Sequence, residues 1–197
     1  KILNIKMDRR KALRNIGTGI GAIAVTPTVV SLFQSCQTAA TYTPAFIPAE
    51  DFDIVSNLME LIIPKTEIPG AIELKLPEFT DAYIAAVWDE NQKASFTEGW
   101  SEFLAASTKA ASKEKPSQLS VEDWDAQLAK YLKPGNDIPA EEEGAAKFAN
   151  QLRSLTVNAF KTNEFIGETV MAYAPIPGEQ RGCVDLMETT GGKAWSL

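Results

Sequence analysis

The sequence predicts an all-α protein: a single helical domain of about five helices, followed by an irregular C-terminal tail. Three observations support this fold class. Between residues 49 and 173, apolar side chains recur every three or four positions in five separate stretches. Proline and glycine separate these stretches. No part of the chain shows the alternation of apolar and polar residues that is typical of a half-buried strand.

Length and composition fit one globular domain. The chain has 197 residues, of which 45% are hydrophobic and 23% are charged. Without the N-terminal segment described below, about 160 residues remain, which is enough for a single core. The formal net charge of −7 argues against a nucleic-acid-binding surface.

Each predicted helix has its own boundary signals. Pro64 ends the first, and Pro77 opens the second. Ser120 and Asp123 form a capping pair at the start of the fourth. The fifth is the longest, with an interruption at residues 162–167. The predicted helices span residues 49–63, 77–89, 91–112, 120–132 and 139–173.

Two patterns within these helices have a structural and a functional interpretation. The apolar stripe of the second helix is interpreted as core rather than as a binding site. It consists of Phe79, Tyr83, Ile84, Val87 and Trp88. The three consecutive glutamates 141–143 are interpreted as a solvated helix start, because adjacent helical residues point in different directions and do not form a metal site.

Residues 1–36 have the organisation of an export signal. A basic head contains Arg9 and Arg10, and Leu13 follows at the spacing of a twin-arginine signal. A weakly apolar run covers residues 16–33, diluted by glycine and threonine, so it makes a poor permanent membrane span. We predict export of the folded chain by the twin-arginine route. The alternative is a basic amphipathic helix without a targeting role.

Cys36 is the candidate lipidation site, because the preceding residues 33–35 resemble a lipobox. A disulfide with Cys183 and a free thiol remain as alternatives. Residues 37–48 are predicted to be a linker, since Pro44 and Pro48 favour an extended tether. Together these features predict a periplasmic, membrane-anchored lipoprotein.

The sequence predicts no catalytic, cofactor-binding or metal-binding residue. There is no histidine, and two cysteines cannot hold a four-cysteine iron–sulfur cluster. Neither GxGxxG nor GxxxxGK[ST] occurs. Carboxylate chemistry remains as an alternative, in which a free-standing lyase or glycosidase would use acidic side chains. The acidic residues available for it are Asp81, Asp123, Asp125 and Glu164.

Two irregular segments are the candidate partner interface. One is the turn at residues 64–71, and the other is the tail at residues 174–197, where isolated apolar residues interrupt a polar sequence. Packing of both segments on their own domain is the alternative interpretation. The candidate residues are Pro64, Thr66, Pro69, Gly70, Pro177, Gly178, Cys183 and Trp195.

Three features together resemble the gluconate 2-dehydrogenase subunit 3 family. They are the twin-arginine signal, the turn IIPKTEIPGA, and the segment FKTNEFIG that leads into YAPIPG and a later Gly-Cys. Family members more usually carry Asp and Thr where this chain has Glu67 and Ile68. The resemblance covers nearly all of the chain after the signal.

The resemblance implies a small, cofactor-free subunit of a membrane-bound sugar or sugar-acid dehydrogenase. It implies a large partner subunit of the glucose-methanol-choline oxidoreductase type that holds FAD and is carried through the twin-arginine pathway by the small subunit. It also implies transfer of electrons to a cytochrome c or another acceptor. The alternative is a lipoprotein binding or scaffold module without a dehydrogenase partner.

Overall fold

The computed structural model describes residues 42–176, 178 and 183–196, and those from Thr43 onward form one compact unit. The predicted signal residues Arg9, Arg10 and Leu13 lie outside the described residues, as do Cys36 and Pro177. The predictions that concern these residues therefore remain predictions.

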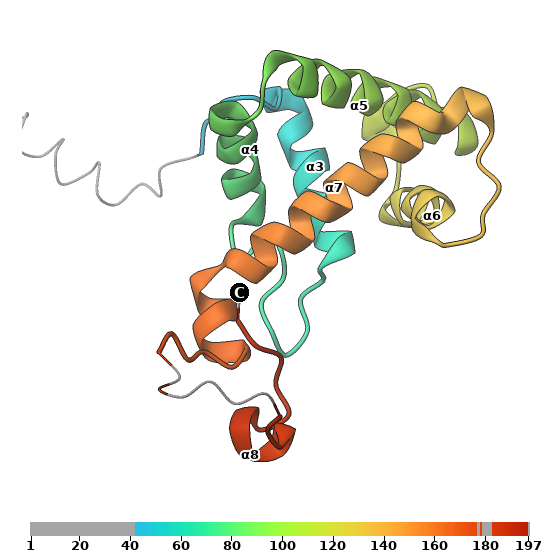
Figure 1. Cartoon of the computed structure of the whole chain (residues 1–197). Coiled ribbons are helices and arrows are strands. Elements are labelled where there is room, and N and C mark those ends of the chain that lie inside the picture. The colour runs from blue at the N-terminus through green and yellow to red at the C-terminus, as the bar shows by residue number, and fades with distance from the viewer. Residues whose placement is uncertain (1–41, 177, 179–182, 197) are drawn as a thin grey trace, which may run out of the picture. The chain divides into compact units, whose positions relative to one another are not determined.

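The described part of the chain is helical, and its one β-like feature is an isolated bridge between Ala172 and Trp195 (Figure 1). Its α-helices are α3 (Ala49–Ile62), α4 (Leu76–Val87), α5 (Glu90–Ala110), α6 (Val121–Leu132), α7 (Glu143–Thr162) and α8 (Leu186–Thr190). Two short 3₁₀ segments, η1 (Pro116–Gln118) and η2 (Ala140–Glu142), and one π-helical turn, η3 (Ile166–Val170), complete it. No described helix is long and apolar enough to cross a membrane.

The all-helical prediction is confirmed, and the boundaries agree with the capping chemistry. Ser120 caps α6, where its hydroxyl accepts from the Asp123 N–H at 3.2 Å and Asp123 accepts from the Ser120 N–H at 2.9 Å. Asp89 and Gln92 form a second capping box that starts α5 immediately after α4 ends.

Two details of the predicted helices need correction. The longest predicted helix, 139–173, is three elements: the 3₁₀ segment η2, then α7, and the π-helical η3 after the interruption that was expected at 162–167. The tail also contains the five-residue α8, so the described chain has six α-helices where about five were expected. Asp185 caps α8 through the N–H of Glu188, a local signal that the polar composition of the tail concealed.

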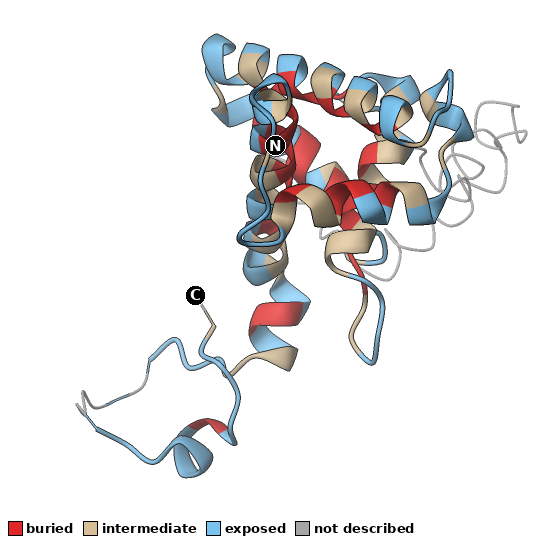
Figure 2. Ribbon diagram, turned by 90° about the vertical axis from the view of Figure 1, so that its right-hand side faces the viewer, coloured by how far each residue is buried: buried red, intermediate tan, exposed pale blue. Residues whose placement is uncertain are grey.

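Helix α7 is the central element of the unit, and α3, α4, α5 and α6 all pack against it (Figures 1 and 2). The buried face of α7 meets a cluster of aromatic rings from α5 and α6. Phe148 lies 4.9 Å from Phe96 and 5.3 Å from Phe103, measured between ring centroids. Such ring pairs add stabilisation beyond the area that they bury.

Helices α5 and α7 approach closely because small residues lie at their crossing. A Cβ atom on Gly99 would lie 3.0 Å from both the carbonyl oxygen of Gly144 and the Cβ of Phe148. Glycine at this position therefore sets the distance between the two helices and allows Phe148 to reach the aromatic cluster.

The segment before α3 is part of the folded unit. The carboxylate of Asp81 on α4 is fully buried and accepts from the N–H groups of Ala45, Phe46 and Ile47 at 2.6, 3.0 and 2.7 Å. Ile47 is itself buried in the core. The last residues of the expected linker 37–48 are thus packed against α4 rather than extended.

Candidate docking surface

The turn between α3 and α4 is shaped by one carboxylate. Glu60 on α3 accepts from the N–H of Lys65 at 3.0 Å with one oxygen, and from the N–H of Ile72 at 2.8 Å with the other. A Cβ atom on Gly70 would lie 2.2 Å from Glu60 Oε1, so only glycine leaves room for this arrangement. The backbone pair Ala71 N–H to Ile63 O, at 3.0 Å, closes the base of the turn.

The four candidate residues of the turn divide into two groups. Pro64 and Thr66 are exposed at its tip, whereas Pro69 is half-buried and Gly70 is buried. Next to the tip, Lys65 pairs with Glu73 at 2.7 Å, and this hydrogen bond raises the pKa of Lys65. The exposed tip is available to a partner, and the buried residues give it a fixed conformation.

The tail leaves η3 and returns to it. Ala172 N–H donates to Ala194 O at 2.8 Å, and Ser196 N–H donates to Ala172 O at 2.9 Å. Lys193 Nζ adds a bond to Thr169 O at 3.2 Å. These contacts join the two ends of a long loop, residues 173–195, which contains α8. We call this loop the excursion of the tail.

The described residues of this excursion contain little core. Thr190 is their one buried residue. Trp195 is 48% exposed and Ile176 is 87% exposed. Cys183 and Gly178 are exposed, and Cys183 has no disulfide partner among the described residues. Other large apolar side chains of the excursion are also exposed: Tyr173, Val184, Leu186 and Met187. Exposed apolar groups at this density are typical of a surface that contacts another molecule.

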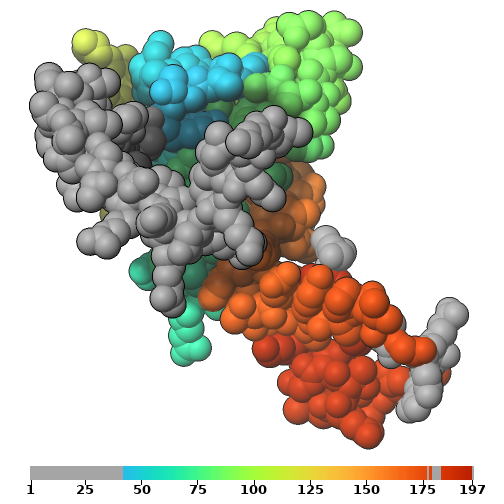
Figure 3. All heavy atoms as spheres, turned by 90° about the vertical axis from the view of Figure 1, so that its left-hand side faces the viewer, coloured from blue at the N-terminus to red at the C-terminus, as the bar shows by residue number. Residues whose placement is uncertain are grey.

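The turn and the tail do not form one continuous patch. In Figure 2 the turn and α8 lie on different sides of the lower end of α7, and in Figure 3 the tip of the turn is likewise separate from the atoms of the tail. A partner that contacts both segments would therefore have to reach around the end of α7 and η3.

A further apolar surface lies on α4, where the sequence analysis expected only core. Ile84 is fully buried as expected, but Phe79, Tyr83 and Val87 are 51%, 40% and 60% exposed. The interpretation of these three residues as core was wrong. The polar residues of α4 do not indicate its outer side, because two of them, Thr80 and Asp81, are buried.

A cavity of about 370 Å³ opens between α4 and α7 beside this surface. Thr80 lines it, and its Oγ1 atom is buried without a hydrogen-bond partner in the described part of the chain. A neighbouring hollow of about 320 Å³ shares Trp88, Leu155 and Asn158 with it. The sequence offered one sign of this surface, namely the lack of charge on the outer positions of α4.

The acidic residues considered for catalysis have separate surroundings. Asp81 binds three backbone N–H groups and Asp123 caps α6, whereas Asp125 and Glu164 are exposed. Among the described residues, no group of three acidic or cysteine side chains could hold a metal ion. The structure therefore gives the first two carboxylates a role in folding.

One of the three consecutive glutamates differs from expectation. Glu142 is bonded to Lys130 and accepts from the Tyr131 hydroxyl at 2.7 Å, so it joins η2 to α6 instead of being fully solvated. The bond from Lys130 lowers the pKa of Glu142. Burial, together with Glu142, raises the pKa of Tyr131.

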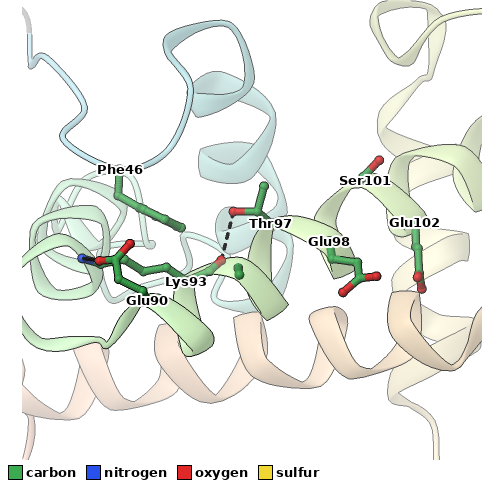
Figure 4. A pocket seen from close by; sticks show the side chains of 8 residues that line it. Phe46, Glu90, Lys93, Thr97, Glu98, Ser101 and Glu102 are labelled. Atoms are coloured by element: carbon green, nitrogen blue, oxygen red, sulfur yellow. Dashed lines mark hydrogen bonds and ion pairs between the residues drawn. The ribbon is translucent and has the colours of Figure 1, made fainter.

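Another hollow, of about 750 Å³, lies along α5 and is open to solvent. Its charged side chains are spread along the helix and do not converge on one point (Figure 4). Glu90 pairs with Lys93 at 3.2 Å, while Glu98 and Glu102 lie further along α5. We assign no chemistry to this hollow.

The fold and these surfaces define a class: a small all-helical protein with exposed apolar segments at a turn, a tail and one helix. The sequence profile of gluconate 2-dehydrogenase subunit 3 matches residues 49–178, two thirds of the chain. The chain belongs to this family, as its motifs indicated. The comparison with curated proteins and the comparison with solved structures each returned no match.

Proposed function

We propose that this chain is the non-catalytic small subunit of a dehydrogenase complex. In this role it escorts, exports and anchors an FAD-dependent partner of the glucose-methanol-choline oxidoreductase type, which oxidises a sugar, sugar acid or glycoside. The observation that carries the proposal is the family match over residues 49–178, because the family is named as a subunit of a dehydrogenase.

The exposed surfaces support a docking role. The tip of the turn presents Pro64 and Thr66 on a backbone held by Glu60, which lowers the entropy lost on binding. The excursion of the tail exposes apolar side chains such as Ile176 and Trp195. Because the two segments lie on different sides of α7, we propose that this chain contacts the flavoprotein at two separate places.

The chemistry of the complex is assigned to the partner. In this proposal FAD resides in the flavoprotein, and electrons pass from it to a cytochrome c or another acceptor. The absence of histidine from the sequence supports the assignment, because histidine is the side chain most often used for acid–base catalysis near neutral pH and for haem ligation.

Export and anchoring are assigned to the N-terminal segment. Arg9, Arg10 and Leu13 form the twin-arginine signal that takes the folded complex to the periplasm, and Cys36 is the site of lipid attachment. Replacing both arginines by lysine retains the charge. This replacement should leave the chain and the flavoprotein together in the cytoplasm, which cell fractionation with flavin absorbance would measure.

The decisive experiment is affinity purification of the chain, expressed with its own signal in its own host. The expected result is a co-purifying flavoprotein, identified by mass spectrometry and by its flavin absorbance spectrum. Purification of a colourless chain without a flavoprotein would contradict the proposal.

A further inference from the structure

We propose that the outer face of α4 and the α4–α7 cavity beside it form a docking site for the flavoprotein subunit. The partner would insert an uncharged aromatic side chain with a hydrogen-bonding group into the cavity. This inference rests on the proposed function, since it identifies a third contact surface of the same complex.

The exposed residues of α4 carry no charge, and Glu78 beside them is half-buried. Phe79, Tyr83 and Val87 follow one another at intervals of four residues, and Ala82 and Ala86 are exposed beside them. An apolar helix face is normally covered, because exposed apolar surface costs free energy in water. The buried side of α4 is covered by this chain, so we assign its outer side to another molecule.

The cavity beside this face has the lining of a binding site. Three aromatic side chains, Phe79, Tyr83 and Trp88, contribute to its wall, and the rings of the first two stack at 6.2 Å. Its volume of about 370 Å³ lies within the range of about 300–1,000 Å³ that is usual for ligand pockets. One aromatic side chain of a partner fits this space.

Polar atoms at the cavity lack partners that an inserted group would supply. Thr80 is 2% exposed, and its hydroxyl has no hydrogen bond within the described residues. Gln151 Oε1, at the neighbouring hollow, is likewise buried without a bond in the part of the chain that is described. A buried polar group without a partner is destabilising. A tyrosine or tryptophan of the partner has both the ring for the cavity and the polar group for Thr80.

The charges around the site favour a different protein over a second copy of this chain. Of the residues that line the cavity and its neighbouring hollow, Lys147 is the one with a charge. Two copies would each bring a net charge of −7, and this surface provides no opposite charges to offset their repulsion. An uncharged, apolar surface on the flavoprotein would bind this face without such charge repulsion.

Substitution of Val87 tests the face with a closely matched control. Val87→Lys places a charge on the outer face of α4, and Val121→Lys places the same charge at a valine of almost equal exposure on α6, 61% against 60%. The flavoprotein would be purified with the wild-type chain and then separated from it. Full-length variants would be titrated against this free flavoprotein. We expect Val87→Lys to weaken binding at least about tenfold and Val121→Lys to change it less than about twofold. Unfolding midpoints would verify that both variants are folded.

Thr80→Val tests the cavity, because it should change stability and binding in opposite directions. Replacing the hydroxyl by a methyl group removes a buried polar atom without a partner, so the unfolding midpoint of the isolated chain should rise. The same change removes the bond that the partner would make, so the dissociation constant should increase about tenfold. A role confined to folding would not weaken binding in a more stable variant.

The outcomes separate this inference from the proposed function. If the wild-type chain binds no flavoprotein, both fail. If the wild-type chain binds but Val87→Lys and Thr80→Val bind equally tightly, the proposed function stands and the docking site is wrong. Self-association of the wild-type chain in sedimentation, abolished by Val87→Lys, would assign the face to a second copy and overturn the inference.

Discussion

Glu60 and Gly70 together determine the conformation of the turn between α3 and α4. The carboxylate binds the backbone on both sides of the turn, at Lys65 and at Ile72, and Gly70 provides the space for it. The proline and glycine of the turn indicate where the helix stops. The carboxylate that accepts from the N–H groups of Lys65 and Ile72 comes from the preceding helix.

Gly70→Ala should destabilise the protein by about 1–3 kcal/mol, because the new Cβ would displace a carboxylate held by two backbone bonds. Urea unfolding followed by circular dichroism would measure the change. The control is the same substitution in a Glu60→Ala background, where the steric conflict is absent and most of the added cost should disappear. An equal cost in both backgrounds would show that the conflict with Glu60 is not its cause.

Asp81 connects the start of the folded unit to α4. Asp81→Asn should cost about 2 kcal/mol or more, because its amide group cannot accept from all three N–H groups of residues 45–47. The measurement is the free energy of unfolding in urea, and the control is Asp125→Asn at an exposed position of α6. A loss no larger than that of the control would contradict the structural role.

At the scale of elements, α6 and η2 are joined by a network that depends on pH. Glu142 bonds to Lys130 and Tyr131, and Gln127 Nε2 donates to the Tyr131 hydroxyl at 2.7 Å. The folded-state pKa of Glu142 is below its ordinary value of 4.5, chiefly because of the bond from Lys130. The folded protein therefore binds fewer protons at this site than the unfolded chain does.

The stabilisation from this carboxylate is fully present above pH 4.5 and is lost as the pH falls through the folded-state pKa. Glu142→Gln should lower the unfolding midpoint near neutral pH and should reduce its decrease in acid. Glu141→Gln, at an exposed neighbour, should change neither. If the unfolding midpoints of the wild type and Glu142→Gln decreased equally as the pH falls, the prediction would be contradicted.

The elements themselves follow closely from the sequence. Helix α3 begins and ends within one residue of the predicted range 49–63, and the capping box at Ser120 is where the pattern placed it. These features are local, since a cap and its N–H group are only a few residues apart. Helix α8 was missed because five residues contain too little periodicity to be recognised.

At the scale of the whole molecule, the tail contributes little to the core and much to the exposed apolar surface. Removing residues 171–197 should lower the unfolding midpoint by only a few degrees, since Thr190 is the one buried residue in the described part from 173 onward. The same truncation should reduce co-purification of flavin absorbance, because it removes the contacts proposed for the tail while the turn and α4 remain.

The point variant Ile176→Ser provides a finer test of the tail, because this side chain is 87% exposed and contributes little to folding. It should keep the unfolding midpoint of the wild type and reduce the amount of co-purified flavin. Full retention of flavin by both the truncated chain and Ile176→Ser would show that the tail is not part of the interface.

The sequence by itself determined the helical class, most helix boundaries and the family. All three depend on residues that are near one another in the chain: apolar periodicity, caps, breakers and short motifs. The tertiary structure decided which side of α4 is buried, and what Asp81 and Glu142 bind. Asp81 meets partners 34 to 36 residues away, and Glu142 meets partners on α6, so no local pattern identifies them. Polarity does not indicate which side of α4 is buried, because Thr80 and Asp81 lie on the buried side and Val87 on the exposed side.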